Sequence, residues 1–275
     1  MKVSVIFSTY NAPRWLEKVL WGFAHQTVSD FEIVIADDGS AQETADLIER
    51  IKAKIAIPIR HVWQPDEGFQ KCRILNKAIA ASTGEYLIFT DGDCIPRADF
   101  IEQHLLHADK DTFLSGGYFK LPMGISELIT EEDVRSQRVF DTAWLEAHGL
   151  PKSHKSWKLL ARGVWAQILN TISPAKPTWN GHNASCYKTH VIAINGFDER
   201  MQYGGEDCEF GDRLRNHGIK PRRIRYSAVC VHLDHARGYV TEAMLQKNQL
   251  IRAQTQQEKR VRSPLGLDQY LSAGD

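Results

Sequence analysis

Strand-like and helix-like patterns alternate through the first hundred residues of the chain. Four short runs rich in β-branched and aromatic residues predict strands: "KVSVIFST", "FEIVIADDGS", "IRHVWQ" and "EYLIFTDGD". The segments between them, "PRWLEKVLWGFAHQ", "QETADLIERIKAKI" and "QKCRILNKAIAAST", have the apolar spacing of helices. Strands joined by helices of this length need crossover connections, which place helices on both faces of a sheet. The sequence therefore predicts an α/β fold with a mostly parallel central sheet flanked by helices.

The second half of the chain is less regular. Residues 127–170 have a helical pattern, "EDCEFGDRLRNHG" predicts a helix that ends at a glycine, and "RRIRYSAVCVHLDH" predicts one strand. No linker is long enough to force a domain split. We expect one domain made of two halves, residues 1–107 and 108–252, followed by a polar peripheral tail at 253–275.

Charge and cysteine content narrow the class of protein. The 275 residues include 34 Lys and Arg and 34 Asp and Glu, so the formal net charge is zero. Proteins that coat nucleic acid need a basic excess, so we expect no nucleic-acid partner.

The five cysteines have no CxxC spacing, which favours reduced thiols in a cytoplasm. The N-terminal apolar stretch is too short and too interrupted for a signal peptide, and no window has 18 uninterrupted apolar residues. We expect a cytoplasmic protein.

Polar residues gather where three of the predicted strands end. The three clusters are Ser8, Thr9, Tyr10 and Asn11; Asp37, Asp38, Gly39 and Ser40; and Asp91, Gly92 and Asp93. Ligands of parallel sheets bind beyond the carboxyl ends of the strands. We therefore expect the three clusters to converge on one edge of the sheet.

The acids of "FTDGDCIP" predict a metal site. Asp91 and Asp93 can both point into one crevice, and Mg²⁺ or Mn²⁺ prefers such oxygen ligands. A solvated Asp-Gly turn is the ordinary alternative. His232 and His235, at the end of an apolar run, could add imidazole ligands, a mixture that suits Mn²⁺, although surface histidines would look the same.

A second acidic cluster, "YGGEDCEF", predicts the catalytic base. Two glycines allow close approach of a ligand, and Glu206 and Asp207 then open a helix whose dipole keeps carboxylates ionised. An ionised carboxylate in an open approach can take a proton from a hydroxyl, whereas helix capping is the ordinary alternative. Tyr203 could offer its ring to a sugar or pack in the core.

Two cations at the start of one predicted helix, Lys71 and Arg73, could pair with a diphosphate. Solvation at the surface is the default for either. Of the two, Arg73 is the one we favour.

These segments resemble the family 2 glycosyltransferases of the GT-A fold. The matching stretches are "VSVIFSTYN", "QTVSDFEIVIADDGS", "GFQKCRILNKAIAASTGEYLIFTDGDCIP", "NGFDERMQYGGEDCEFGDRLRNHG" and "HLDH", in family order. The resemblance covers residues 1–107 and 178–238. Its second block is also similar to galactosyl- and N-acetylgalactosaminyltransferase domains, in which the Gly-Gly-Glu-Asp stretch carries the base and the acceptor contacts.

The resemblance assigns roles to residues. It implies a nucleotide site, a metal site, a catalytic pair and a sugar pocket. The nucleotide site would comprise Ser8, Thr9, Tyr10 against uracil, Asn11, Asp38, Arg73 and Asp91; the metal ligands Asp93 and His235, with Asp91 and His232; the catalytic pair Asp207 as base and Glu206 as acceptor-binding acid; and the sugar pocket Trp179, Asn180, Asn183, Tyr203 and Gly205.

The implied activity is metal-dependent transfer, with inversion, of a sugar from a UDP-linked donor to a hydroxyl of a glycan or lipid-linked glycan. The implied cofactor is Mn²⁺ or Mg²⁺, and the implied setting is polysaccharide biosynthesis. Segment 120–175 matches nothing in the family and should carry acceptor specificity. Its basic stretch "KSHKSWKLLAR" could touch an anionic glycan or the inner face of a membrane, although a helix that only packs the domain is the more ordinary interpretation.

Two other functions remain open at this point. A nucleotidyltransferase shares such a nucleotide-binding half, but "FSTYNAPRW" lacks the glycine-rich basic loop expected after its first strand. A non-catalytic relic that only binds sugars or nucleotides is the second. The presence of Asp93, Asp207 and His235 argues against a relic.

Overall fold

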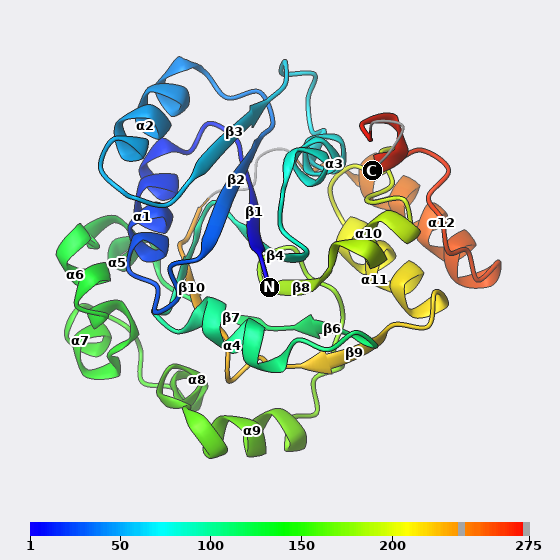
Figure 1. Cartoon of the computed structure of the whole chain (residues 1–275). Coiled ribbons are helices and arrows are strands. Elements are labelled where there is room, and N and C mark those ends of the chain that lie inside the picture. The colour runs from blue at the N-terminus through cyan, green and yellow to red at the C-terminus, as the bar shows by residue number, and fades with distance from the viewer. Residues whose placement is uncertain (236–239, 272–275) are drawn as a thin grey trace.

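The computed structural model describes residues 1–235 and 240–271 (Figure 1). Its strands are β1 (Val3–Thr9), β2 (Phe31–Asp37), β3 (Ile59–Trp63), β4 (Tyr86–Asp91), β5 (Cys94–Pro96), β6 (Thr112–Ser115), β7 (Gly117–Lys120), β8 (Ala184–Tyr187), β9 (Lys220–Arg223) and β10 (Val229–His232). The α-helices are α1 (Pro13–Ala24), α2 (Gln42–Lys52), α3 (Lys71–Ala81), α4 (Phe100–His107), α5 (Met123–Leu128), α6 (Glu131–Arg135), α7 (Thr142–Ala147), α8 (Trp157–Leu160), α9 (Gly163–Ile172), α10 (Lys188–Ala193), α11 (Glu206–Asn216) and α12 (Glu242–Gln257). Short 3₁₀ turns occur at η1 (Arg138–Phe140), η2 (His154–Ser156) and η3 (Leu267–Gln269).

A seven-stranded sheet in the order β3-β2-β1-β4-β8-β6-β9 forms the centre of the fold. The four N-terminal strands are parallel: β1 pairs with both β2 and β4, and β2 pairs with β3. β8 runs antiparallel to β4 and β6, and β9 is parallel to β6. The predicted α/β class with a mostly parallel sheet flanked by helices is confirmed.

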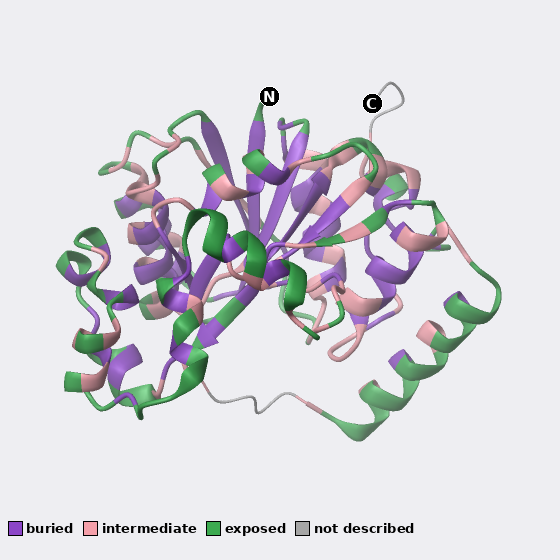
Figure 2. Cartoon of the chain, turned by 90° about the horizontal axis from the view of Figure 1, so that it is seen from below, coloured by how far each residue is buried: buried purple, intermediate pink, exposed green. Residues whose placement is uncertain are grey.

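Both faces of the sheet are covered. Alternate residues of each central strand point to opposite faces, so β1 sends Val5 and Phe7 into a core with α1 and α2 and sends Ile6 into another core with α3, α10 and α11. β2 divides its side chains in the same way. The central strands are accordingly buried along their length (Figure 2), and only the strand ends are left to form a site.

A second, three-stranded sheet brings distant residues together. Its order is β5-β10-β7, with β10 antiparallel to β5 and parallel to β7. The register sets His232 opposite Cys94, one residue after Asp93. Backbone pairing therefore places Asp93, the last residue of the Asp-Gly-Asp turn, beside the strand that carries His232.

The segment predicted as one strand, "RRIRYSAVCVHLDH", is two strands, and that prediction is wrong. β9 pairs in the large sheet and β10 in the small one, with a turn between them in which the N–H groups of Ser227 and Ala228 donate to the Ile224 carbonyl. Arg97, which is 2% exposed, donates to the Ser227 carbonyl at 2.6 Å and holds the turn. A backbone turn satisfied by a distant guanidinium leaves no periodic signal in the local sequence.

Residues 120–175 form short helices on the outside of the molecule. In Figure 1, α8 and α9 lie along the outer edge, away from α1–α3. Two buried contacts tie them to the core: Arg97 donates to the Ala161 carbonyl at 3.2 Å, and the Asn170 amide donates to Ser227 Oγ at 2.9 Å. In the described ranges, no helix is long and apolar enough to cross a bilayer.

Of the segment expected to be a peripheral tail, 253–275, residues 253–271 are anchored to the core, and residues 272–275 lie outside the described residues. Leu267 is fully buried in the core formed with α3, α10 and α11, and its N–H donates to the Asn195 carbonyl. Thr255 Oγ1 donates to Glu209 of α11 at 2.8 Å. The segment is mostly polar, so its sequence provides no indication that these few residues are buried.

Candidate active site

The three polar clusters meet at the carboxyl edge of the parallel strands. Ser8 Oγ lies 3.4 Å from Asp91 Oδ1, which links the ends of β1 and β4. Asn11 links the ends of β1 and β2, since its N–H donates to Ser40 Oγ and its side-chain oxygen accepts from the Ala41 N–H, both at 2.9 Å. The parallel register thus places these side chains at one edge, as the strand pattern predicted.

Tyr10 and Asp38 flank this edge in different ways. The Tyr10 side chain is 49% exposed, and its hydroxyl donates to Asp66 at 2.8 Å, so one face of the ring is open to a ligand. Asp38 is buried and accepts from the Gln70 N–H and the Gln64 amide, at 2.9 and 2.7 Å. Burial raises the pKa of Asp38 to about 6. Asp38 therefore holds the loop before α3 in place at the rim of the site.

Lys71, the first residue of α3, supplies the cation of the site. Its Nζ lies 2.9 Å from Asp91 Oδ1. Burial lowers the pKa of Lys71, but Asp91, Asp207 and Glu206 together raise it well above its usual range. The ammonium is thus charged and faces three carboxyl groups from two halves of the chain.

Arg73 lies elsewhere, so the choice of Arg73 over Lys71 is not supported. Its Nη1 pairs with Glu67 at 2.6 Å, and Tyr270 and Glu199 are its other ionisable neighbours. A shift of two residues along a helix turns a side chain to a different face. The structure therefore places Lys71, and not Arg73, beside Asp91.

Gly181 fits closely between Lys71 and Asp207. A methyl group at this position would lie 2.8 Å from Asp207 Oδ2 and 3.1 Å from Lys71 Nζ. The Gly181 N–H also donates to the Asp207 carboxyl. Sequence reasoning missed this glycine, although it stands within the "TWNGHNAS" stretch that the family resemblance had marked.

The acidic pair that opens α11 follows two glycines in the left-handed region. Gly204 and Gly205 have φ values of 102° and 90°, a conformation that favours glycine. Glu206 turns back to accept from the Gly204 N–H at 2.8 Å. Nothing lies within 4 Å of the place where a Gly205 side chain would begin, so the approach to the pair is open.

Burial changes the electrostatics expected for this pair. The helix dipole was expected to keep both carboxyl groups ionised, but burial, with the Asp207 charge added, raises the pKa of Glu206 to about 7. Burial also raises the pKa of Asp207, against the opposing effect of Lys71. Asp207 Oδ1 is buried and has no hydrogen-bond partner in the described part of the chain. This oxygen can therefore accept a hydrogen bond from a bound ligand, as a group that removes a proton from that ligand must.

Three of the four residues predicted as metal ligands, Asp93, His232 and His235, lie together, whereas the fourth, Asp91, pairs with Lys71. His235 Nε2 lies 3.0 Å from Asp93 Oδ2, and His232 Nε2 lies 3.5 Å from the same oxygen. The two imidazole rings stack with their centroids 5.4 Å apart. Cys94 joins the group, since its sulfur and the ligand atoms of Asp93 and His232 all lie within 4.8 Å of one another. Sequence reasoning missed Cys94, because only the pairing of β5 with β10 reveals its neighbours.

The donor set fits a divalent ion of intermediate hardness. A carboxylate with two imidazoles suits Mn²⁺ better than Mg²⁺, and His232 Nδ1 is a buried atom without a partner among the described residues. Burial raises the pKa of Cys94 well above its usual range, which disfavours the thiolate form that binds metals. Asp93, His232 and His235 are therefore the residues that could hold the ion.

Two residues assigned to the sugar pocket lie in the core instead. Trp179 is 1% exposed and packs against Phe89 and Phe210. Asn183 is fully buried, and its amide donates to the Gly117 and Ala228 carbonyls at 3.0 Å each. These assignments are wrong because the stretch crosses from the surface into β8, so only part of it faces a ligand.

The other sugar-pocket residues stay near the surface. Asn180 is partly exposed and lines a cavity described below. Tyr203 packs edge-to-face on Phe69, with ring centroids 5.7 Å apart, at the entrance to the glycine pair. His182 was not predicted: burial lowers its pKa to about 4, and Asp91 and His232 are among the ionisable groups that act on it.

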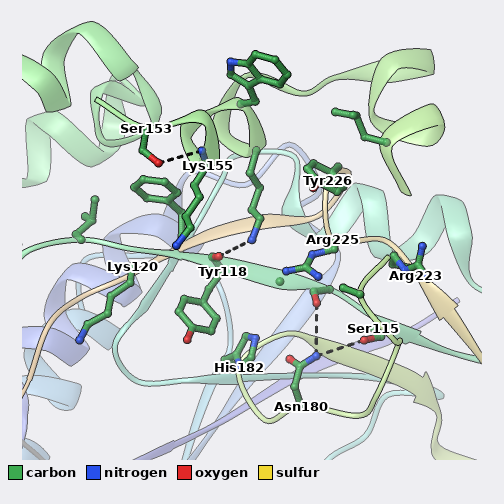
Figure 3. Close-up of a pocket in the computed structure, with 18 of the residues that line it drawn as sticks. Ser115, Tyr118, Lys120, Ser153, Lys155, Asn180, His182, Arg223, Arg225 and Tyr226 are labelled. Atoms are coloured by element: carbon green, nitrogen blue, oxygen red, sulfur yellow. Dashed lines mark hydrogen bonds between the residues drawn. The ribbon is translucent and has the colours of Figure 1, made fainter. Parts of the chain in front are cut away.

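A cavity of about 970 Å³ opens beside this cluster (Figure 3). It lies between β7, the α8–α9 segment and the turn between β9 and β10, and it includes Asn180, His182 and Asp234. Figure 3 shows Tyr118 and His182 next to each other on one wall and Lys155 reaching toward them from the helical segment. The cavity therefore borders the metal cluster on the side formed by the second half of the chain.

Comparison with known proteins matches both halves of the chain. Residues 4–128 match glycosyl transferase family 2, and residues 173–236 match the N-terminal domain of galactosyltransferase. Validoxylamine A glucosyltransferase of Streptomyces hygroscopicus subsp. jinggangensis is 27% identical over an alignment of 278 positions. The alignment covers 91% of this chain and 60% of that protein. The chain thus spans less than two thirds of the length of this relative.

Solved structures share the fold. S. aureus TarS 1–349 in complex with UDP-GlcNAc superposes with a TM-score of 0.64 at 16% identity, covering 98% of this chain and 69% of that one. The mannosyltransferase PcManGT from Pyrobaculum calidifontis, in complex with GDP-Man and Mn²⁺, superposes with a TM-score of 0.56 at 21% identity. This match covers 86% of this chain and 58% of that one. The fold, the order of motifs and the matched segments agree: residues 4–128 are similar to glycosyl transferase family 2, residues 173–236 to the N-terminal domain of galactosyltransferase, and the chain has the GT-A fold of these solved structures.

Proposed function

We propose that this chain transfers a sugar from a nucleotide diphosphosugar to a hydroxyl of a glycan or lipid-linked glycan, with inversion at the anomeric carbon. One observation carries the proposal: Lys71 faces Asp91 on the nucleotide side and Asp207 on the acceptor side of the same site. A donor phosphate and an acceptor hydroxyl can therefore meet at one place.

The residues divide the work of the reaction. Asp207 removes the proton of the acceptor hydroxyl, and the oxygen attacks the anomeric carbon from the face opposite the diphosphate. The bond from that carbon to the diphosphate oxygen breaks, and its electron pair leaves with the nucleoside diphosphate. Lys71 opposes the charge that develops there, and Glu206 positions the acceptor.

The nucleotide would lie along the strand ends. The exposed ring of Tyr10 offers a stacking face for the base, and the loop held by Asp38 forms the rim. UDP is the nucleotide we propose; TarS has been solved with UDP-GlcNAc and PcManGT with GDP-Man. Asp93, His232 and His235 would hold Mn²⁺, which when bound neutralises diphosphate charge.

The test is release of nucleoside diphosphate from a panel of donors, UDP-Glc, UDP-Gal, UDP-GlcNAc, UDP-GalNAc and GDP-Man, with analysis of the sugar product. We expect release from one UDP-sugar, and an inverted anomeric configuration in the product. Pyrophosphate formation from UTP and a sugar 1-phosphate would instead identify a nucleotidyltransferase. Binding of a nucleotide sugar without any turnover, with or without acceptors, would identify a relic.

Removal of metal should abolish transfer. We expect EDTA to reduce activity to background and Mn²⁺ to restore it more fully than Mg²⁺. Asp93→Asn should weaken Mn²⁺ binding by at least about tenfold, as expected when a ligand is lost. Electron paramagnetic resonance of Mn²⁺ measures this binding. Asp46→Asn, on the exposed face of α2, is the matched control. Full activity in EDTA, or normal Mn²⁺ binding by the Asp93 variant, would contradict the metal assignment.

A further inference from the structure

The cavity beside the active site is lined by cations. Six Lys and Arg side chains border it: Lys120, Lys155, Lys158, Lys176, Arg223 and Arg225. Among the lining residues only Asp234 carries a carboxylate, and Lys120 pairs with it at 2.9 Å. In a chain whose formal net charge is zero, this concentration of one sign needs an explanation.

Two of these cations, Lys158 and Arg225, border the same glycine, Gly117, and the Lys158 ammonium donates to the Tyr118 carbonyl at 2.8 Å. A methyl group at Gly117 would lie 3.5 Å both from Lys158 Nζ and from Arg225 Nε, so the two groups share one patch of backbone. Neither pairs with a carboxylate of the described chain, and Arg225 Nε is buried without a hydrogen-bond partner. Burial, followed by the Arg225 charge, lowers the pKa of Lys158 to about 8. Like charges held together out of water are unfavourable unless an anion joins them.

The cavity leads to the proposed catalytic centre. His182 lines the cavity, and the charges of Asp91, Asp93 and His232 all act on it. Asn180, another lining residue, precedes Gly181, whose N–H donates to Asp207. A molecule held in the cavity can therefore extend toward the catalytic base.

We propose that this cavity binds an anionic group, a phosphate or a carboxylate, of the acceptor, through Lys158 and Arg225. Calling the ligand an acceptor rests on the proposed glycosyl transfer, whereas the existence of the anion site does not. The group could be the phosphate of a lipid diphosphate or the carboxylate of an anionic glycan, and both are oxyanions that Lys and Arg side chains bind by charge-assisted hydrogen bonds.

Calorimetric titration in saturating UDP and Mn²⁺ tests the site, because the nucleotide position is then filled. The probes are inorganic pyrophosphate, farnesyl diphosphate and a hyaluronan tetrasaccharide. We expect inorganic pyrophosphate to bind, and Arg225→Ala and Lys158→Met each to weaken it about tenfold, the usual effect of losing one charge-assisted hydrogen bond. Tighter binding of farnesyl diphosphate indicates a lipid-linked acceptor, and tighter binding of the tetrasaccharide indicates an anionic glycan.

Control variants keep the outcomes distinct. Lys54→Ala, an exposed cation after α2, should change nothing. UDP binding should be equal in all variants, so failure of the wild-type protein to bind UDP would count against the proposed function and not against the anion site. Pyrophosphate that binds equally to the Arg225 and Lys158 variants, or only in place of UDP, would overturn the inference.

A second feature belongs to the same segment, and one of its residues, Trp157, also borders the cavity. α8 and α9 expose six large apolar side chains, each between 43% and 72% accessible: Trp157, Leu160, Val164, Trp165, Ile168 and Ile172. On α9 they follow helical spacing, while Ala166 and Asn170 face the protein. Contiguous apolar surface of this kind on a folded protein usually marks an interaction site. We call these six residues the α8–α9 face.

The charges around this face identify its partner. Residues 147–197 contain no Asp or Glu and carry six Lys and Arg. Lys152, Lys155, Arg162 and Lys176 are exposed and lie near the face in sequence, and Lys155 and Lys176 also line the cavity. Apolar and tryptophan side chains with a basic rim match the interface of an anionic bilayer, whereas a second copy of the chain would set cations against cations.

We propose that the α8–α9 face docks on a membrane surface rich in anionic lipid. Co-sedimentation with vesicles of phosphatidylglycerol and phosphatidylcholine should show binding that pure phosphatidylcholine vesicles and high salt weaken. Trp165→Ala combined with Ile172→Ser should reduce binding at least about tenfold, since two apolar side chains no longer enter the interface. Leu250→Ser, a change of an exposed apolar residue of α12, is the matched control.

The result that overturns this second inference is equal sedimentation of the double variant and the wild-type protein. Absence of vesicle binding together with concentration-dependent dimerisation, lost in the double variant, would assign the face to a second copy. Both measurements use the full chain and need no knowledge of donor or acceptor.

Discussion

Replacing Asp207 with asparagine should reduce turnover by about a thousandfold, the middle of the range for loss of a general base. The amide keeps the shape of the side chain and can still accept from the Gly181 N–H, but it cannot take a proton from the acceptor. UDP binding should stay within about twofold of the wild-type protein, because no nucleotide contact is assigned to Asp207. Transfer assays and calorimetry with UDP measure the two effects separately.

The neighbouring carboxyl group provides the control. Glu206→Gln removes a buried acid next to Asp207 but leaves the proposed base in place. We expect its main effect on the KM for the acceptor, with a much smaller change in kcat. Turnover unchanged in the Asp207 variant, or lost only in the Glu206 variant, would move the base to Glu206.

Replacing Lys71 with methionine should damage both stability and catalysis. Without the ammonium, Asp91 and Asp207 are left facing each other with no opposite charge between them. Removing one partner of a buried pair costs about 3–5 kcal/mol, and because Lys71 and Asp91 keep 17% and 24% of their side-chain surface we expect about 2–3 kcal/mol. Activity should fall more than a hundredfold, since the diphosphate loses its cation.

Arg73 supplies a matched control two residues away. Its ion pair with Glu67 is largely exposed, so Arg73→Ala should cost less than about 1 kcal/mol. Chemical denaturation compares the two variants, and UDP titration shows whether the cation contributes to binding. Equal effects of the Lys71 and Arg73 changes would contradict the placement of Lys71 at the centre of the site.

The parallel half of the fold could be predicted because its signals are local and repeated. The strands β1, β2 and β4 are short, buried apolar runs, and the helices between the strands have a stripe of apolar residues. Together they determine the sheet and the edge at which Ser8, Asp38 and Asp91 gather. Polar residues at the ends of parallel strands are a strong indicator because topology brings them together whatever the loops do.

The errors arise where the answer depends on contacts between distant segments. Lys71 and Arg73 have similar chemistry, and only the rotation of α3 decides which one faces Asp91. Trp179 and Asn183 stand in a stretch without periodicity, so its burial could not be read locally. Cys94 approaches the histidines only through a strand pair. Residues 129–172, most of the segment expected to match nothing, lie outside both matched family models, and the basic cavity that they help to form depends on tertiary packing.

The pairing of β5 with β10 affects the order in which the protein can acquire its parts. Cys94 and His232 are partners in the register although 137 residues stand between them, so the loop that must close is among the longest in the chain. During synthesis, the N-terminal layer of parallel strands can assemble while the imidazoles have not yet left the ribosome. A nascent or truncated chain that ends before residue 229 would hold the strand-end acids without the imidazoles proposed to complete their ion site.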